Sequence, residues 1–245
     1  MRPLSMWIII SVLLLFSSSP VPGGEISLSS ANYPPYFGPH LKNYGPVSEI
    51  ITRAFHHAGY RVTISFYPWV RGEQKARAGE HDGMFPPWHT REREAYFLYS
   101  DPLFPNEIGF FKRRGMEISF KTWEDLRPYK IGICRGYANP KGFNEAKLNT
   151  EEVAFDKQNL MKLIRGRIDL TLIDKKLAFY IIATEFPGYS DALEWMDPPL
   201  ESKMQYLCLS RKKPDHGKVM ERFNRGLSVL RQSGEYQDIL LKHGF

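Results

Sequence analysis

The feature that most constrains the fold is a repeated order of strand, helix and strand over residues 25–82. Residues 25–30 (EISLSS) and 61–67 (RVTISFY) alternate apolar and polar side chains, as half-buried strands do. Between them, residues 45–57 place apolar side chains at helical spacing, and a second helical segment follows Trp69. This order is typical of a parallel sheet with helices on its faces. Ligands of such sheets bind outside the carboxyl ends of the strands.

The length of 245 residues suits either one large domain or two lobes of roughly 100 residues each. Arg2, the apolar run 6–16 and the small-residue zone 17–24 form the pattern of a signal peptide. Because this run is too short to span a bilayer comfortably, we expect an exported chain that starts near Gly24 or Glu25. No cysteine follows the run, so a lipid anchor is not indicated and we expect a periplasmic location.

Charge and motifs argue against several classes of function. The formal net charge is +6, or +5 without Arg2, and the basic residues are spread along the chain without a nucleic-acid-binding motif, so no nucleic acid is expected as a partner. The sequence has no Gly-x-Ser-x-Gly, His-Glu-x-x-His or Cys-His metal spacing, so we expect neither a cofactor nor a metal. An oxidising compartment permits a Cys134–Cys208 disulfide, but buried free thiols are the commoner outcome for cysteines in strands.

The most informative stretch is 82–102, which reads DGMFPPWHTREREAYFLYSDP. Thr90, Glu92 and Arg93, followed by residues 99–102, resemble the T-x-E-R…F-S-D-P signature of family 3 of the bacterial extracellular solute-binding proteins. Members of this family deliver polar amino acids to ABC importers. The resemblance implies that Arg93 grips the carboxylate of the ligand, a role that suits a planar guanidinium with parallel donors. The alternative is an ordinary helix start, with Thr90 as N-cap and Arg93 in a surface ion pair.

The resemblance runs over the whole mature chain and implies an α/β fold of the type II periplasmic binding protein class. This fold has two lobes, each a sheet flanked by helices, joined by two crossover strands. The lobe limits that we expect are 25–108 with 206–245 for lobe I and 109–205 for lobe II. The expected crossover segments are 103–112 and 205–210.

The resemblance also implies a set of ligand contacts. Tyr36, in a Pro-Pro-aromatic turn, would pack against the ligand, with Trp69 nearby at a strand's carboxyl end. Tyr137 follows a glycine whose successor in relatives binds the ligand carboxylate, and Asp174 would pair with the ligand's ammonium group. Two alternatives stay open, because Tyr36 could instead cover the edge of the core and Asp174 could cap a helix.

This chain departs from the family pattern just before the signature. Pro86, Pro87 and Trp88 stand where relatives have small residues and a Ser or Thr. The two prolines remove two N–H donors. Trp88 then fills part of the pocket or stacks on a planar or cationic ligand. A small polar ligand, anionic or zwitterionic, is therefore a safer expectation than a standard α-amino acid.

Three functions are compatible with these features. The first is a monomeric receptor, not an enzyme, that captures a small polar, amino-acid-like ligand between closing lobes and presents it to a membrane ABC permease. The second is a dehydratase-like enzyme on the same fold, for which His89 and Glu92 are the nearest candidate acids. The third is a ligand sensor that acts through a separate signalling partner.

Overall fold

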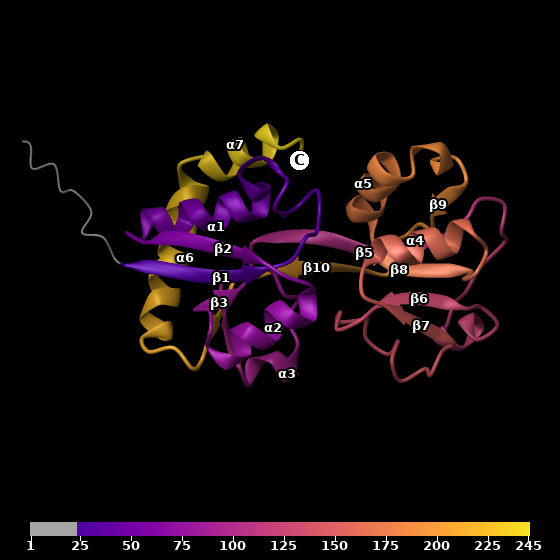
Figure 1. The fold of residues 1–245 in the computed structure, drawn as a ribbon, viewed down its shortest axis with the longest axis horizontal. Coiled ribbons are helices and arrows are strands. Elements are labelled where there is room, and N and C mark those ends of the chain that lie inside the picture. The colour runs from indigo at the N-terminus through magenta and orange to yellow at the C-terminus, as the bar shows by residue number, and fades with distance from the viewer. Residues whose placement is uncertain (1–23) are drawn as a thin grey trace, which may run out of the picture.

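The computed structural model describes residues 24–245, so the expected signal peptide lies outside the described residues apart from Gly24. Within 24–245, no helix is both long and apolar enough to cross a membrane. The chain forms two lobes of mixed α/β structure that lie side by side (Figure 1). The strands are β1 Glu25–Ser30, β2 Arg61–Phe66, β3 Gly83–Met84, β4 Phe97–Tyr99, β5 Phe104–Arg113, β6 Ile131–Cys134, β7 Thr150–Val153, β8 Leu170–Asp174, β9 Leu193–Trp195, β10 Glu201–Gln205 and β11 Cys208–Ser210. The helices are α1 Pro46–His57, α2 Trp69–Ala78, α3 Arg91–Glu94, α4 Asp156–Ile164, α5 Lys175–Glu185, α6 His216–Gln232 and α7 Glu235–Lys242, with 3-10 turns at Lys42–Tyr44, Trp123–Leu126 and Pro187–Tyr189.

The first lobe contains a five-stranded sheet with the order β2-β1-β3-β11-β4. Strand β1 pairs in parallel with β2 and β3, as the strand-helix-strand order predicts, while β11 is antiparallel to both of its neighbours. Helices α1 and α2 cover opposite faces of this sheet (Figure 1). Helix α1 packs against α6, where the rings of Phe55 and Phe223 lie 4.7 Å apart.

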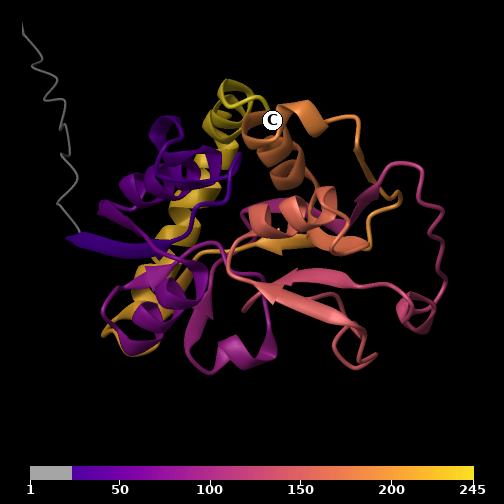
Figure 2. The same cartoon turned by 45° about the vertical axis from the view of Figure 1, so that its right-hand side comes forward.

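The second lobe contains a six-stranded sheet with the order β10-β5-β8-β6-β7, and β9 pairs with β5. Strands β5 and β10 run antiparallel to each other where the two lobes meet (Figure 2). Strand β5 matches the first expected crossover. The return differs from the expectation, because it lies on β10 and the next strand, β11, already belongs to the first sheet. The sequence of β10, ESKMQ, is polar, so hydrophobic periodicity does not predict this strand, although its side chains alternate in burial.

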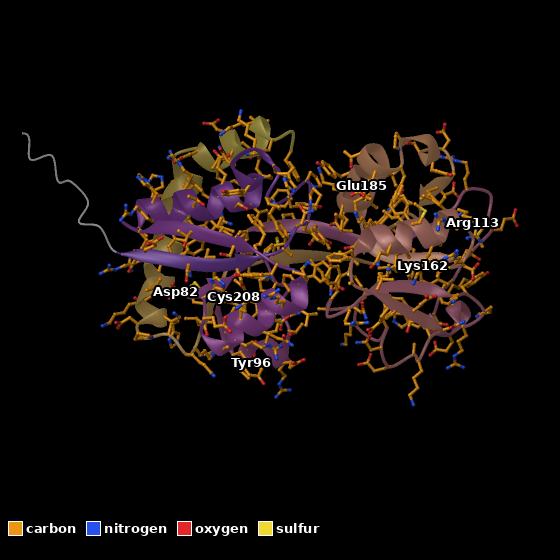
Figure 3. All side chains as sticks on the ribbon, in the orientation of Figure 1. Asp82, Tyr96, Arg113, Lys162, Glu185 and Cys208 are labelled. Atoms are coloured by element: carbon orange, nitrogen blue, oxygen red, sulfur yellow. The ribbon has the colours of Figure 1, made fainter. Side chains whose placement is uncertain are left out.

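Strand β7 ends at Val153, and α4 begins three residues later at Asp156. The two cysteines are both free and buried. Cys134 lies in β6 and Cys208 in β11, in different lobes, and Figure 3 labels Cys208 within the first lobe.

Candidate functional site

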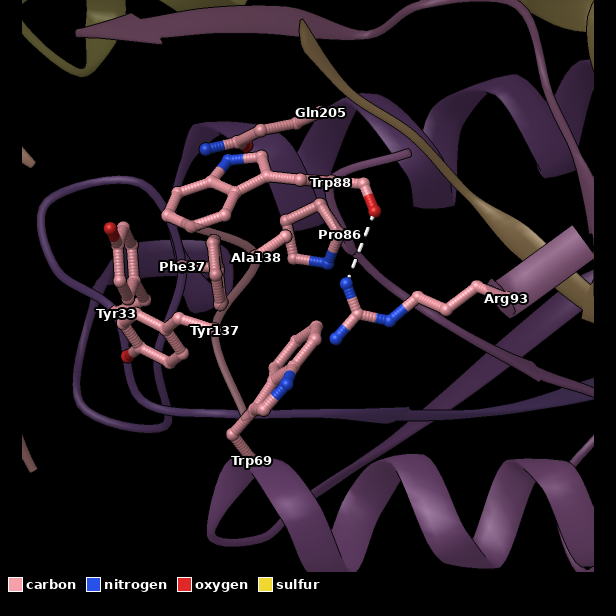
Figure 4. Close-up of a pocket in the computed structure, with 9 residues that line it drawn as sticks. All are labelled: Tyr33, Phe37, Trp69, Pro86, Trp88, Arg93, Tyr137, Ala138 and Gln205. Atoms are coloured by element: carbon pink, nitrogen blue, oxygen red, sulfur yellow. Dashed lines mark hydrogen bonds between the residues drawn. The ribbon is translucent and has the colours of Figure 1, made fainter. Parts of the chain in front are cut away.

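A cavity lies between the lobes and is walled mainly by aromatic side chains (Figure 4). Its lining comes from the loop after β1, the start of α2, the loop before α3, the turn after β6 and the end of β10. The lining residues are Tyr33, Phe37, Trp69, Pro86, Trp88, Arg93, Tyr137, Ala138 and Gln205. The free space is about 30 Å³, which is room for two or three water molecules. A larger solute therefore enters only if the walls move apart.

The structure brings together four of the predicted contacts, Trp69, Trp88, Arg93 and Tyr137, around this cavity. The ring of Tyr137 meets those of Trp88 and Trp69 edge-on, at centroid distances of 5.7 and 6.3 Å. The Arg93 guanidinium lies over the Trp69 ring at 5.5 Å, and the Lys203 ammonium lies over the Trp88 ring at 5.0 Å. Each of the two indoles thus already carries a cation of the protein on one face.

Arg93 is held by contacts from both lobes. Its Nε and Nη2 atoms donate to the two carboxylate oxygens of Glu73 at 3.2 and 2.9 Å. Its Nη1 donates to the carbonyl of Trp88 at 3.3 Å, and Nη2 donates also to the carbonyl of Gly136, in the second lobe, at 3.0 Å. The surface ion pair considered for Arg93 is wrong, because its side chain is only 7% exposed and that of Glu73 only 10%.

Glu73 is the partner that sequence reasoning missed. It lies on α2, four residues before Arg77, which also donates to it. Burial opposes its ionisation, but the hydrogen bonds and charges of Arg93 and Arg77 outweigh burial and hold the pKa of Glu73 below its usual value. In sequence, Glu73 and Arg77 form an ordinary i, i+4 surface pair, so only the packing of α2 against α3 reveals the buried ion pair.

Thr90 caps α3, as the helix-start interpretation predicts. Its hydroxyl accepts a hydrogen bond from the Arg93 backbone N–H at 3.3 Å, and its side chain is absent from the cavity lining. The capping bond fixes the first turn of α3 and thereby the direction in which the Arg93 side chain leaves the backbone. A direct ligand contact by Thr90 stays a prediction.

Tyr36 and Asp174 contact each other rather than the cavity. The Tyr36 hydroxyl donates to Asp174 at 3.0 Å, and the other carboxylate oxygen of Asp174 accepts the Leu177 N–H at 2.7 Å, which makes Asp174 the N-cap of α5. Both residues are buried, and burial raises the pKa of Asp174 to about 7. Tyr33 and Phe37, which flank Tyr36 in the same turn, line the cavity instead. Contacts of Tyr36 and Asp174 with a ligand stay predictions.

A second buried carboxyl group lies behind the cavity wall. The hydroxyl of Tyr137 donates to Asp156, the first residue of α4, at 2.9 Å. Burial raises the pKa of Asp156 to about 6. Over residues 24–245, no group of three or more His, Cys, Asp or Glu side chains is placed to hold a metal ion.

Comparison with known proteins identifies the family and the fold. The model of the bacterial extracellular solute-binding proteins, family 3, matches residues 27–245. The chain belongs to this family. The ABC transporter arginine-binding protein 1 of Escherichia coli (strain K12) is 25% identical to this family 3 protein over 155 residues. These residues are 61% of this chain and span 60% of the length of that relative.

Solved structures show that this solute-binding protein has the type II periplasmic binding protein fold. An ancestral arginine-binding protein bound to arginine superposes with a TM-score of 0.76 at 17% identity, over 92% of this chain and all of that one (100%). A mutant of ArgBP from T. maritima superposes with a TM-score of 0.74 at 18% sequence identity, and the match covers 89% of this chain and 94% of that one. A histidine kinase sensor domain superposes with a TM-score of 0.79 at 19% sequence identity, and the match covers 90% of this chain and 96% of that domain. The matched family and these neighbours are binding proteins or binding domains, not enzymes.

Proposed function

We propose that this family 3 protein is a periplasmic receptor that captures a small polar, amino-acid-like solute between its lobes and presents it to an ABC importer. The observation that carries the proposal is the cavity between the lobes, whose walls come from both of them. Its position at the carboxyl ends of β1 and β2 is where ligands of open α/β sheets bind. The arginine-binding relative from Escherichia coli supports an amino-acid-like solute and an ABC importer.

In this proposal, the two lobes close around the solute. We keep their limits as 25–108 with 206–245 and 109–205, which is supported by the separation of the strands into two sheets. Since the free space in the closed cavity holds only a few waters, the solute binds an open form, and closure around it shifts the open–closed equilibrium that the importer reads. A monomer leaves both lobes free to move.

The proposed contacts begin with the four predicted residues on the cavity, Trp69, Trp88, Arg93 and Tyr137. We add Tyr33, Phe37 and Gln205, which share the lining. We propose an indirect role for Tyr36, Thr90 and Asp174. Tyr36 belongs to the turn beside the cavity, Thr90 caps α3 and Asp174 caps α5, and these structures support the residues that contact the solute.

A thermal-shift screen of the mature protein tests the proposal. The screen would contain amino acids, capped amino acids, dicarboxylates and polyamines. A solute at about a thousandfold over its dissociation constant adds about 4 kcal/mol to the free energy of unfolding, which is easily measured. The shift should vanish in Trp88→Ala and persist in Trp123→Ala, which lies outside the cavity lining. A screen without any stabilising solute, or a shift unaffected by Trp88→Ala, would contradict the proposal.

A sensor is the second candidate, because a histidine kinase sensor domain superposes on this chain with a TM-score of 0.79. Sensing would use the same cavity and closure but a signalling partner in place of a permease. Solute uptake by cells that lack the gene separates the two: lost uptake supports the importer, and unchanged uptake with a lost response to the solute supports the sensor.

The dehydratase-like alternative is disfavoured by the positions of its candidate acids. His89 pairs with Glu94 at 2.7 Å near the surface, and Glu92, whose side chain is 76% exposed, pairs with Arg77. Neither belongs to the cavity lining. The ionisable residues of the lining are Arg93, Tyr33 and Tyr137, and burial raises the pKa of both tyrosines well above the usual value, which does not suit proton transfer near neutral pH.

A further inference from the structure

We propose that the solute carries no free carboxylate, and that this receptor selects an uncharged, amide-bearing solute such as a capped amino acid. The inference rests on the proposed function and names the chemical class that the same cavity takes. Two observations carry it. Glu73 already binds the guanidinium of Arg93, and two polar atoms of the cavity lining have no hydrogen-bond partner among the described residues.

The donors of Arg93 are almost fully used. A guanidinium has five N–H groups. The Glu73 carboxylate accepts hydrogen bonds from the Nε N–H and from one N–H of Nη2. The Gly136 carbonyl accepts the second N–H of Nη2, and the Trp88 carbonyl accepts one N–H of Nη1. These four bonds leave a single N–H on Nη1. A carboxylate needs two parallel donors for the fork-to-fork grip, so it would either replace Glu73 on the Nε–Nη2 edge or replace the Gly136 carbonyl on the Nη1–Nη2 edge and share Arg93 with Glu73.

The charge of Glu73 opposes that exchange. A carboxylate brought to Arg93 would lie beside a second, buried carboxylate, and two like charges at hydrogen-bonding distance repel strongly in a site shielded from water. Glu73 also cannot swing freely, since Arg77 holds the same carboxylate from the next turn of α2. The ion pair therefore acts as a built-in substitute for the carboxylate that family 3 arginines are expected to grip.

A cationic solute is disfavoured by the aromatic walls. One face of Trp69 already carries Arg93, and one face of Trp88 carries Lys203, whose ammonium also donates to the Ala138 carbonyl at 2.6 Å. A further cation between these indoles would meet the ammonium of Lys203, while the charge of Arg93 is already balanced by Glu73. With a carboxylate excluded by Glu73, the remaining class is uncharged.

Two buried polar atoms indicate what an uncharged solute would offer. The side-chain carbonyl of Gln205 and the hydroxyl of Tyr33 belong to lining residues, and neither has a hydrogen-bond partner among the described residues. Gln205 is 1% exposed and lies beside the indole of Trp88 (Figure 4). A buried acceptor without a partner is costly, so a solute N–H that reaches it is strongly selected. An amide N–H on an apolar body meets this requirement.

Matched pairs of solutes test the inference by calorimetry at neutral pH. The probes are N-acetyl amino acid amides and the corresponding N-acetyl amino acids, which differ only in a carboxamide or a carboxylate, together with the free amino acids. For wild type we expect at least one amide to bind about tenfold or more tightly than its acid. Glu73→Gln should lower that ratio by about tenfold or more, because it frees the charge of Arg93. Glu92→Gln, a matched change on the exposed carboxylate near Arg77, should leave the ratio unchanged.

The possible failures are distinguishable. If an acid or a free amino acid binds wild type as tightly as the amide does and loses binding in Arg93→Ala, the solute displaces Glu73; the inference is then overturned while the receptor proposal stands. If no probe binds wild type or Glu73→Gln, the receptor proposal fails together with the inference. A double variant, Glu73→Met with Arg93→Met, replaces the buried pair by apolar side chains and serves if Glu73→Gln does not fold. It should still prefer the amide, and loss of that preference would also overturn the inference.

Discussion

At the scale of single residues, two buried aspartates give the protein an unusual response to pH. Burial raises the pKa of Asp174 to about 7 and that of Asp156 to about 6, and each carboxyl group accepts a hydrogen bond from a tyrosine. The usual value for Asp is about 4. The folded protein therefore keeps protons that the unfolded chain releases between about pH 4 and pH 7. The free energy of unfolding should fall as the pH rises through this window, and level off above it.

Asp174→Asn tests this linkage. The variant has no carboxyl group to protonate at this position, so its stability should fall less than that of wild type between pH 5 and pH 8, by a difference on the order of 2 kcal/mol. The measurement is urea unfolding at several pH values, and comparing the two slopes cancels the contributions of all other groups. Asp191→Asn, at an exposed aspartate, should follow wild type. Equal slopes for wild type and Asp174→Asn would contradict the prediction.

Single residues also show which parts of the candidate site a sequence motif can predict. The signature predicts that Arg93 lies on the cavity, and the alternative of an ordinary helix start predicts that Thr90 caps its helix; both follow from local sequence. The partner of Arg93 could not be predicted, since Glu73 lies 20 residues away and its pattern is that of a surface residue. The turn at residues 33–37 has three aromatic rings, and which of them face the cavity depends on the backbone path rather than on composition. The family resemblance favoured Tyr36, whereas Tyr33 and Phe37 line the cavity.

At the scale of secondary structure elements, the first lobe depends on a close approach of two helices. Gly226 lies on α6 directly against α1, where an added Cβ would overlap the carbonyl oxygen of Ala54. Hydrophobic periodicity predicted α1, but the contact with α6 requires a residue without a side chain. Glycine is a poor helix former, so its presence mid-helix has a packing reason here.

Gly226→Ala should therefore destabilise the protein by more than about 2 kcal/mol, even though alanine favours the helix by about 1 kcal/mol, because α1 and α6 must move apart. Gly217→Ala is the matched control in the same helix, since its Cβ would meet nothing within 4 Å, and it should be neutral or slightly stabilising. Urea unfolding midpoints of the two variants measure the difference. The explanation by close packing is wrong if both variants unfold at the same midpoint.

At the scale of the whole molecule, the order of elements predicted a parallel α/β sheet, and the family resemblance predicted two lobes. The parallel pairs around β1 follow from the strand-helix-strand order, and the family signature extends this to both lobes. The return crossover was placed too late, because β10 is polar and half-exposed and is held as a strand by its pairing with β5. How the lobes meet could not be predicted at all, since it depends on contacts between residues far apart in sequence.

One such contact offers a test of lobe closure that needs no solute. The carbonyl of Gly136 in the second lobe accepts hydrogen bonds from Trp69 and Arg93 in the first, at 3.2 and 3.0 Å. A Cβ at Gly136 would lie 2.9 Å from a methyl group of Val70 across the interface, so Gly136→Ala should wedge the lobes apart. Gly115→Ala controls for backbone strain, because Gly115 has a similar φ of +82°, against +78°, with nothing within 4 Å. Small-angle X-ray scattering should give a larger radius of gyration for Gly136→Ala than for wild type and Gly115→Ala. Superimposable scattering curves would mean that these contacts do not set the distance between the lobes.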